Sequence, residues 1–204
     1  MVDAVNRAAR RVPPWALYLL ALLPPAWLLY MGATGGLGAE PIKALEHELG
    51  ELALQLLILG LAITPLRRFA GINLLRFRRA IGVAAFSYAA LHLLVWLALD
   101  VQILSQVWAD IVKRPYITVG MAGFLLLVPL AATSNDWSVR RLGAMRWRRL
   151  HTAVYAAVIL GAVHYVMVQK VWEIGPLLYL AVAAMLVGLR YVPSARPRRA
   201  ARAA

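Results

Sequence analysis

The sequence predicts an all-α integral membrane protein, a bundle of six transmembrane helices with both termini in the cytoplasm. Three observations support this fold class. The 204 residues are 62% hydrophobic and yet carry a net charge of +13, a combination that a soluble domain of this size rarely shows. Six long stretches contain no charged residue, and the basic residues fall in every second gap between those stretches.

The uncharged stretches define the spans. A helix rises about 1.5 Å per residue, so roughly 20 residues cross the hydrocarbon core. Four stretches reach that length, and the second and sixth are shorter but have polar flanks that can reach the interface. We therefore predict spans at 15–33, 48–66, 80–99, 115–134, 150–169 and 173–191, all in a single domain over 1–204, with a basic cytoplasmic tail at 192–204.

The arginines and lysines set the orientation. Of 22 basic residues, 18 lie in the N-terminal segment, the loops after the second and fourth spans, and the tail. The positive-inside rule places these segments in the cytoplasm, as expected for a multi-pass membrane protein. Topology and contact with membrane lipid account for this charge, so no nucleic-acid partner is expected. A signal peptide is disfavoured because the first stretch is longer than a signal core and no clear cleavage site follows it.

The sequence contains no cysteine, which excludes disulfides, cysteine-held iron–sulfur clusters and covalently attached haem. The loops between spans are also too short to form a soluble nucleotide-binding domain, and no glycine-rich phosphate loop is present. Any redox centre must therefore be held by histidine or be a bound organic cofactor.

Three features lie along the spans and loops. Pro24-Pro25 predicts a kink near the middle of the first helix. An acidic cluster that includes Glu46, Glu48 and Glu51 stands at the expected outer start of the second helix, where it suits the helix dipole. The outer loop between the third and fourth spans contains an amphipathic stretch, 101–112, that is expected to lie along the interface.

His92 and His164 are the main candidate ligands. Each lies about thirteen residues past the basic end of its span, so both are expected at one depth in the outer half of the bilayer. A titratable side chain is costly there, and two at matching depth can ligate one metal. Haem iron suits the pair better than zinc, because zinc prefers three or four protein ligands. Two axial histidines leave no open position, so we expect electron transfer; the alternative is an interhelical hydrogen bond. Small residues that would let a porphyrin approach are Ala89, Ala90, Gly161 and Ala162.

His151 lies at the cytoplasmic mouth of the fifth span. The position that would supply its partner, thirteen residues before His92, holds Arg79, which has no lone pair for iron. His151 is thus a weaker metal ligand or part of an inner site for an anionic ring cofactor, a phosphate or a quinone carbonyl. A positive-inside belt is the alternative. The residues of this inner cluster are Arg78, Arg79, Trp147, Arg148 and His151; on the outer side, Arg114 and Lys170 could pair with haem propionates.

An ordered set of motifs runs through nearly the whole chain, and in combination they resemble the MsrQ (YedZ) family of haem-binding membrane subunits, within the ferric-reductase-like transmembrane superfamily. The motifs are Gly36–Pro41 with His47, Ile63–Leu66, Arg78-Arg79 with Gly82 and Leu91–Leu93, Arg114–Tyr116, Thr133-Ser134, Trp147–His151 with Val154-Tyr155, and His164-Tyr165.

The resemblance implies a b-type cytochrome that relays electrons from the quinone pool to MsrP, a periplasmic molybdenum-containing reductase that repairs methionine sulfoxide. It also implies FMN besides haem b, no catalytic residues on this chain, and a catalytic centre on the partner. The superfamily often has four intramembrane histidines, and this chain lacks the fourth. The alternatives are a ferric-reductase-like or oxidase-like carrier fed by a cytosolic flavin reductase, and a histidine-relay proton channel or transporter.

Overall fold

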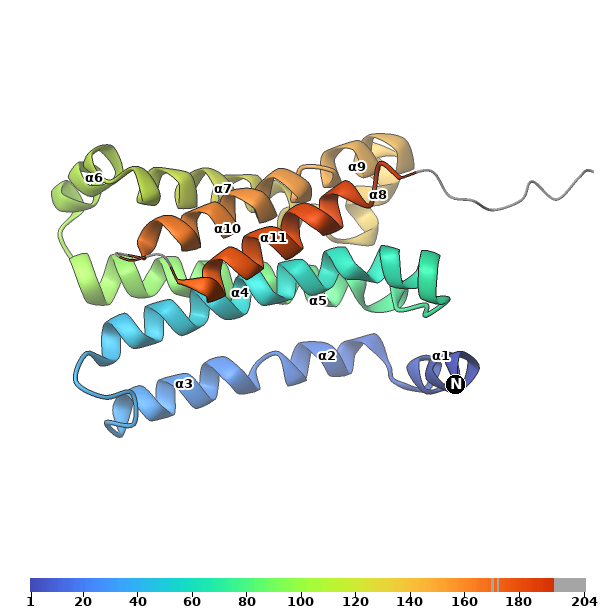
Figure 1. The fold of residues 1–204 in the computed structure, drawn as a ribbon, viewed down its shortest axis with the longest axis horizontal. Coiled ribbons are helices and arrows are strands. Elements are labelled where there is room, and N and C mark those ends of the chain that lie inside the picture. Colours follow the sequence, from blue (N-terminus) through green and yellow to red (C-terminus); the bar gives the residue numbers. More distant parts are fainter. Residues whose placement is uncertain (170, 172, 193–204) are drawn as a thin grey trace, which may run out of the picture.

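The computed structural model describes residues 1–169, 171 and 173–192, and every regular element in that part of the chain is a helix (Figure 1). The all-α class is therefore confirmed, while most of the predicted basic tail lies outside the described residues. Short π-helical turns at Leu66–Ala70 and Trp96–Val101 extend two of the α-helices, and a 3-10 turn lies at Leu75–Phe77. The α-helices are α1 (Val2–Arg11), α2 (Pro14–Leu20), α3 (Leu23–Ala33), α4 (Pro41–Pro65), α5 (Arg78–Val95), α6 (Leu104–Lys113), α7 (Pro115–Ala132), α8 (Asp136–Leu142), α9 (Ala144–His151), α10 (Val154–Val168) and α11 (Ile174–Gly188).

Five helical stretches in the described chain are long and apolar enough to cross a membrane: Pro14–Ala33, Pro41–Ala70, Leu75–Val101, Pro115–Ala132 and Ala144–Val168. The chain is thus a multi-pass membrane protein. Helix α11 is apolar but only 15 residues long. Six spans and cytoplasmic termini therefore stay predictions.

The core of the molecule is a bundle of α4, α5, α7 and α10. Helix α4 packs along α5, α7 packs along α10, and α11 crosses over α4 and α10 (Figure 1). Small side chains such as Ala85 and Ala162 are fully buried between the helices, together with Leu61 and Val158. Small residues let membrane helices approach closely, and this brings the side chains of neighbouring helices into contact at both ends of the bundle.

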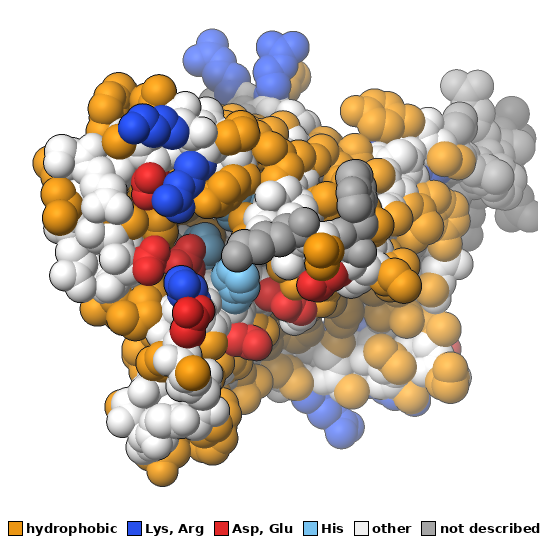
Figure 2. Space-filling model, turned by 60° about the vertical axis from the view of Figure 1, so that its left-hand side comes forward, with side chains coloured by type: hydrophobic (Ala, Val, Ile, Leu, Met, Phe, Trp, Pro, Cys, Tyr) orange, Lys and Arg blue, Asp and Glu red, His pale blue; other side chains and the backbone are white. Residues whose placement is uncertain are grey.

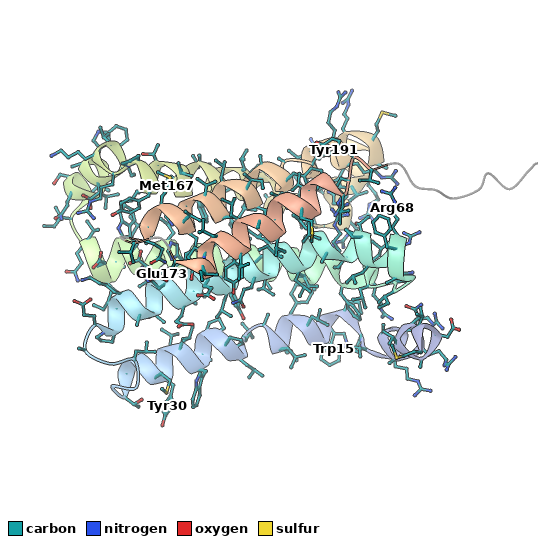
Figure 3. The ribbon with its side chains drawn as sticks, viewed as in Figure 1. Trp15, Tyr30, Arg68, Met167, Glu173 and Tyr191 are labelled. Carbon is teal, nitrogen blue, oxygen red and sulfur yellow. The ribbon has the colours of Figure 1, made fainter. Side chains whose placement is uncertain are left out.

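The first span is broken and lies at the edge of the bundle. Helix α2 ends at Leu20 and α3 begins at Leu23, with Pro24 in its first turn, so the predicted kink is confirmed. The break leaves the Ala21 carbonyl without a helical partner, and the buried Tyr88 hydroxyl of α5 donates to it at 2.6 Å. Trp15 and Tyr30 point away from the bundle (Figure 3).

The two ends of the bundle have opposite character. The arginine-rich end is formed by α1, the 66–77 connection, α8, α9 and the end of α11. The acidic end is formed by the 34–40 connection, the start of α4, α6 and the start of α11, and Figure 2 shows acidic side chains gathered around histidine there. The acidic residues of this end are Glu40, Glu46, Glu48, Asp100, Asp110 and Glu173.

Short helices cover both ends. At the arginine-rich end, Asn6 of α1 donates to the Gly71 carbonyl, and its side-chain oxygen accepts from the Asn73 backbone. At the acidic end, α6 is the amphipathic helix that the sequence predicts: Val107 is buried, whereas Leu104 and Trp108 are exposed. Helix α4 begins at Pro41 and so extends well before the predicted span, because the acidic residues of its first turns do not interrupt the helix.

Candidate functional site

His92 lies on α5 and is directed toward α4. Its Nδ1 is 2.8 Å from the Glu46 carbonyl oxygen. A carbonyl oxygen can only accept, so Nδ1 carries the proton and donates it. The lone pair of the neutral ring is then on Nε2, on the side away from Glu46. A metal-ligating histidine is commonly oriented in this way, by a hydrogen bond from its other ring nitrogen.

His164 on α10 has the same arrangement against a different helix. Its Nδ1 is 2.7 Å from the carbonyl oxygen of Tyr116 on α7. Nδ1 is again the donor and Nε2 again holds the lone pair. The two histidines are therefore fixed in one tautomer by backbone groups of two helices that belong to the rigid core.

Each histidine ring also packs against a glycine. A Cβ atom on Gly50 of α4 would lie 3.0 Å from Nδ1 of His92, and one on Gly120 of α7 would lie 2.8 Å from Nδ1 of His164. In both cases the glycine stands four residues, about one helical turn, after the residue whose carbonyl accepts from the ring. The helix pairs α4–α5 and α7–α10 thus share one arrangement, in which a backbone carbonyl and a glycine of one helix contact a histidine of the other. The sequence alone does not predict this arrangement.

The two rings meet at the spacing of a shared metal ion. The ring centres of His92 and His164 are 6.1 Å apart and the ring planes are inclined by 77°. A metal–imidazole bond is about 2 Å long and a ring nitrogen lies about 1 Å from its ring centre, so two imidazoles on opposite sides of one metal have centres about 6 Å apart. The residues therefore fit a metal with two axial imidazoles.

The surroundings of the pair favour haem over a metal held by protein alone. In the described chain no group of three or more His, Cys, Asp or Glu side chains is arranged to hold a metal ion. Tetrahedral zinc would need such a group, whereas haem iron takes only the two axial ligands from the protein.

A cavity of about 560 Å³ opens at the arginine-rich end, between α4, α5, α7 and the helices α9 and α10. Its deep walls are apolar and include Leu57, Phe86 and Leu127, and its rim is cationic and aromatic. Such a cavity suits a flat apolar ring that bears an anionic group. The rim residues are Arg76, Arg78, Arg79, Trp147, Arg148 and His151, so the predicted inner cluster is brought together.

His151 is held differently from the other pair. Its Nε2 is 3.0 Å from Thr133 Oγ1. That hydroxyl already donates to the Pro129 carbonyl at 2.6 Å, so it accepts from Nε2. The His151 ring stacks on Trp147 with centres 3.8 Å apart, and the Trp147 indole donates to the Thr133 carbonyl at 2.8 Å. Thr133 thus fixes both rings of the cavity rim.

The rim carries more cations than anions. Arg79 Nη2 lies 2.7 Å from Asp136 Oδ1, and this arginine lowers the pKa of the Asp136 carboxyl. Arg190, which the sequence analysis did not single out, donates to the Leu61 carbonyl at 2.9 Å and stacks over Tyr155. At this same end Figure 3 shows Arg68.

Arg114 lies at the acidic end, with His164. Its Nη1 is 3.3 Å from the Tyr116 hydroxyl, and its Nε is 3.3 Å from Asp110 Oδ1. These contacts raise the pKa of the Arg114 guanidinium, which keeps it charged. The residue is half-exposed and stands two positions before the carbonyl that binds His164. Lys170, the other predicted propionate partner, lies outside the described residues.

Comparison with known proteins first defines the class. Residues 49–162, which run from the third turn of α4 into α10 and end two residues before His164, match the family described as ferric reductase like transmembrane component. The chain therefore belongs to this class of membrane proteins. No solved structure gives a significant match.

Curated relatives narrow the class to one family. The chain is 46% identical over 187 residues to a protein of Brucella anthropi, with 91% of this chain and 84% of the relative covered. It is 48% identical to proteins of Agrobacterium fabrum, over 87% of this chain and 83% of the relative, and of Brucella ovis, over 90% and 87%. All three are named protein-methionine-sulfoxide reductase heme-binding subunit MsrQ. The chain belongs to the MsrQ family, as the motifs predicted.

Proposed function

We propose that this protein is a membrane b-type cytochrome that relays electrons from the quinone pool to a periplasmic molybdenum-containing methionine sulfoxide reductase of the MsrP kind. One observation carries the proposal: the His92 and His164 rings stand 6.1 Å apart, each with Nδ1 bound to a backbone carbonyl. The relatives named as heme-binding subunits support the same reading.

The protein would contribute ligand orientation and exclusion of competing chemistry. The Nδ1–H bonds to the carbonyls of Glu46 and Tyr116 fix both rings and raise the basicity of Nε2. Bound haem b would be held by His92 and His164 and would supply a one-electron redox centre. The same bonds hold a proton on Nδ1 of each ring, which disfavours the alternative of a histidine proton relay.

The distribution of arginines indicates how the protein is oriented in the membrane. By the positive-inside rule the arginine-rich end faces the cytoplasm, which puts the proposed haem near the periplasmic face of the inner membrane. Arg114, which stands at that end, is the proposed partner of a haem propionate. Electrons would leave here for the soluble acceptor, and the bond-making chemistry of sulfoxide reduction would occur on that partner.

The cavity at the arginine-rich end is the proposed site of FMN. Its apolar walls suit an isoalloxazine ring, and Arg78, Arg79 and Arg148 at its rim suit a phosphate. Trp147 and His151 present stacked aromatic surface at the rim. The Thr133 hydroxyl occupies His151 Nε2, so His151 supports this site better than it supports ligation of a second iron.

The test is spectroscopic and then functional. We expect the purified protein to show reducible b-type Soret and α bands and the electron paramagnetic resonance of a low-spin, bis-imidazole ferric haem. Co-purified with its periplasmic reductase, it should support quinol-driven reduction of methionine sulfoxide. Absence of a reducible haem spectrum would sink the cytochrome assignment. A haem protein that is reduced only through a soluble flavin reductase would favour the ferric-reductase-like alternative.

A further inference from the structure

A polar network joins α4, α10 and α11 inside the span. Glu51 Oε2 accepts from the Tyr165 hydroxyl at 2.9 Å, and Glu51 Oε1 accepts from the Tyr179 hydroxyl at 2.9 Å. The Gln55 amide nitrogen donates to Glu51 Oε1 at 3.1 Å and to the Tyr179 hydroxyl at 2.8 Å. The proposed haem and flavin sites use none of these four side chains.

The network lies inside the helix bundle, toward its acidic end. Glu51 is ten residues from the start of α4 at Pro41, and Gln55 is ten residues from its end at Pro65. At about 1.5 Å per residue each is roughly 15 Å from the nearer end of the helix. The sequence predicts Glu51 near the outer start of this helix. In the structure it stands ten residues after Pro41, and its partner Tyr165 lies three residues before the end of α10. A carboxylate held among apolar membrane helices is costly and usually serves a function.

The network still has hydrogen-bonding capacity, and that capacity faces the lipid. An ionised carboxylate offers about four lone-pair sites, of which Glu51 uses three. Both hydrogens of the Gln55 amide are used, but its Oε1 accepts from no described residue, and the side chain is exposed on the apolar surface. An unpaired acceptor in hydrocarbon is costly, so a lipid-soluble molecule that donates hydroxyl hydrogen bonds would be bound favourably.

The network also adjoins the histidine pair. Tyr165 follows His164 in α10, and Glu51 follows Gly50, the glycine that packs against the His92 ring. A redox-active ligand at Glu51 would therefore contact side chains that are next in sequence to His164 and to the glycine that packs against His92. In the cavity at the arginine-rich end, by contrast, no described lining residue is a carboxylate that could take the proton of a quinol hydroxyl.

We propose that Glu51, Gln55, Tyr165 and Tyr179 form the binding site for the head group of a membrane quinol, the electron donor in the relay proposed above. One quinol hydroxyl would donate to Glu51 and the other to an exposed acceptor such as Gln55 Oε1. Oxidation of the quinol to the quinone releases two electrons and two protons. Glu51 accepts the first proton, the second is released to water at the acidic end, and the two electrons are passed on to the outer acceptor. There the two electrons and two protons convert a sulfoxide to a sulfide and water.

The experiment measures haem reduction by stopped-flow absorbance, with the haem-loaded protein in lipid nanodiscs and decylubiquinol as the probe. Glu51→Gln keeps the size and most hydrogen bonds but cannot take a proton, and we expect it to slow quinol-driven reduction at least tenfold. Tyr179→Phe should slow it less. Glu48→Gln is the matched control, because Glu48 is exposed at the acidic end of the same helix. Dithionite should reduce the haem fully, with an unchanged spectrum, in every variant.

Three results would count against the proposal in different ways. Normal quinol kinetics in Glu51→Gln, together with slow kinetics in Arg148→Gln, would move the quinol to the arginine-rich cavity and leave the relay intact. A wild-type haem that dithionite reduces and the quinol does not would exclude a quinol donor. A preparation without any haem spectrum would overturn the relay itself, which is a separate failure.

Discussion

The acidic end and the arginine-rich end of the bundle hold their histidines in different ways. At the acidic end, His92 and His164 both donate through Nδ1 to a carbonyl, and both rings rest on a glycine. At the arginine-rich end, His151 is bound through Nε2 to a threonine hydroxyl, and Arg79 pairs with a carboxylate where a second imidazole would be needed. The first arrangement suits a metal between two rings, and the second suits an anion beside one ring.

This difference shows how one repeated helix pair can support two kinds of site. Arg79 precedes His92 by the same thirteen residues by which His151 precedes His164, so the two pairs correspond along their length. At one end both copies supply an imidazole, whereas at the other end one copy supplies a guanidinium, which cannot ligate iron. The exchange of one ring for a permanent cation is sufficient to change the chemistry that this end can support.

The largest expected effect separates the ends directly. His92→Ala and His164→Ala should each abolish haem binding or reduce it to a trace, because one imidazole cannot hold the metal in a bis-axial site. His151→Ala should leave the haem content close to wild type. The measurement is haem per protein by the pyridine haemochrome assay, with the circular dichroism spectrum as a check on folding.

The contrary pattern would reassign the site. If His151→Ala lost the haem while both other variants kept it, the ligands would lie at the arginine-rich end. If all three variants lost it, the two ends would share one cofactor rather than differ.

Much of the fold and the histidine pair could be predicted from the sequence, because spacing fixes depth in a membrane helix. Thirteen residues past a basic end put His92 and His164 at one level, and the structure brings their rings together. The glycines were not predictable in this way. Sequence proximity pointed to Ala89, Ala90, Gly161 and Ala162, but the glycines that contact the rings, Gly50 and Gly120, lie on neighbouring helices whose rotation sequence alone does not fix.

The polar network shows the same limit for Glu51. The charge pattern predicts Glu51 at the mouth of the second span, because other acidic residues stand close to it in the sequence. Helix α4 begins ten residues earlier, at Pro41. The partners of Glu51 on α10 and α11 are more than one hundred residues away in the sequence, and no local pattern connects them.

The next effect tests whether the glycines seat the rings. A Cβ at Gly120 would lie 2.8 Å from His164 Nδ1 and one at Gly50 would lie 3.0 Å from His92 Nδ1, so either alanine must displace a ligand. Overpacking typically costs about 1–3 kcal/mol, or roughly a 5- to 150-fold loss of haem affinity, larger for Gly120→Ala. Gly60→Ala on α4 is the matched control, because its Cβ would meet only Ile81 at an ordinary 3.7 Å. Equal haem affinity in all three variants would show that the glycines are not needed to position the histidine rings.

A smaller effect is expected on FMN binding at the arginine-rich end. Arg148→Gln removes a cation from the cavity rim, and we expect about tenfold weaker binding of FMN, since a hydrogen bond to a charged group contributes about 1.5–3 kcal/mol. Haem content should not change. Arg67→Gln is the control, because Arg67 is exposed at the same end. Flavin fluorescence on titration gives the affinity, and loss of haem with unchanged flavin binding would reverse the assignment of the two cofactors to the two ends.

The smallest expected effect concerns the ion pair between Arg79 and Asp136 at the arginine-rich end. Because Arg79 lowers the pKa of Asp136, the pair stabilises the fold above the ordinary aspartate pKa of about 4, and that contribution is lost as the pH falls through the lowered pKa. Asp136→Asn should therefore lower the melting temperature slightly at pH 7 and leave it unchanged near pH 2, in a detergent whose charge does not vary. Both partners are partly or fully exposed, so high salt should shrink the difference at pH 7. The haem spectrum should be the same in the variant, because the acidic end is held by bonds to backbone carbonyls, which do not titrate. A variant that alters that spectrum at pH 7 would show that the two ends are coupled, and that Arg79 acts on the histidine pair from across the bundle.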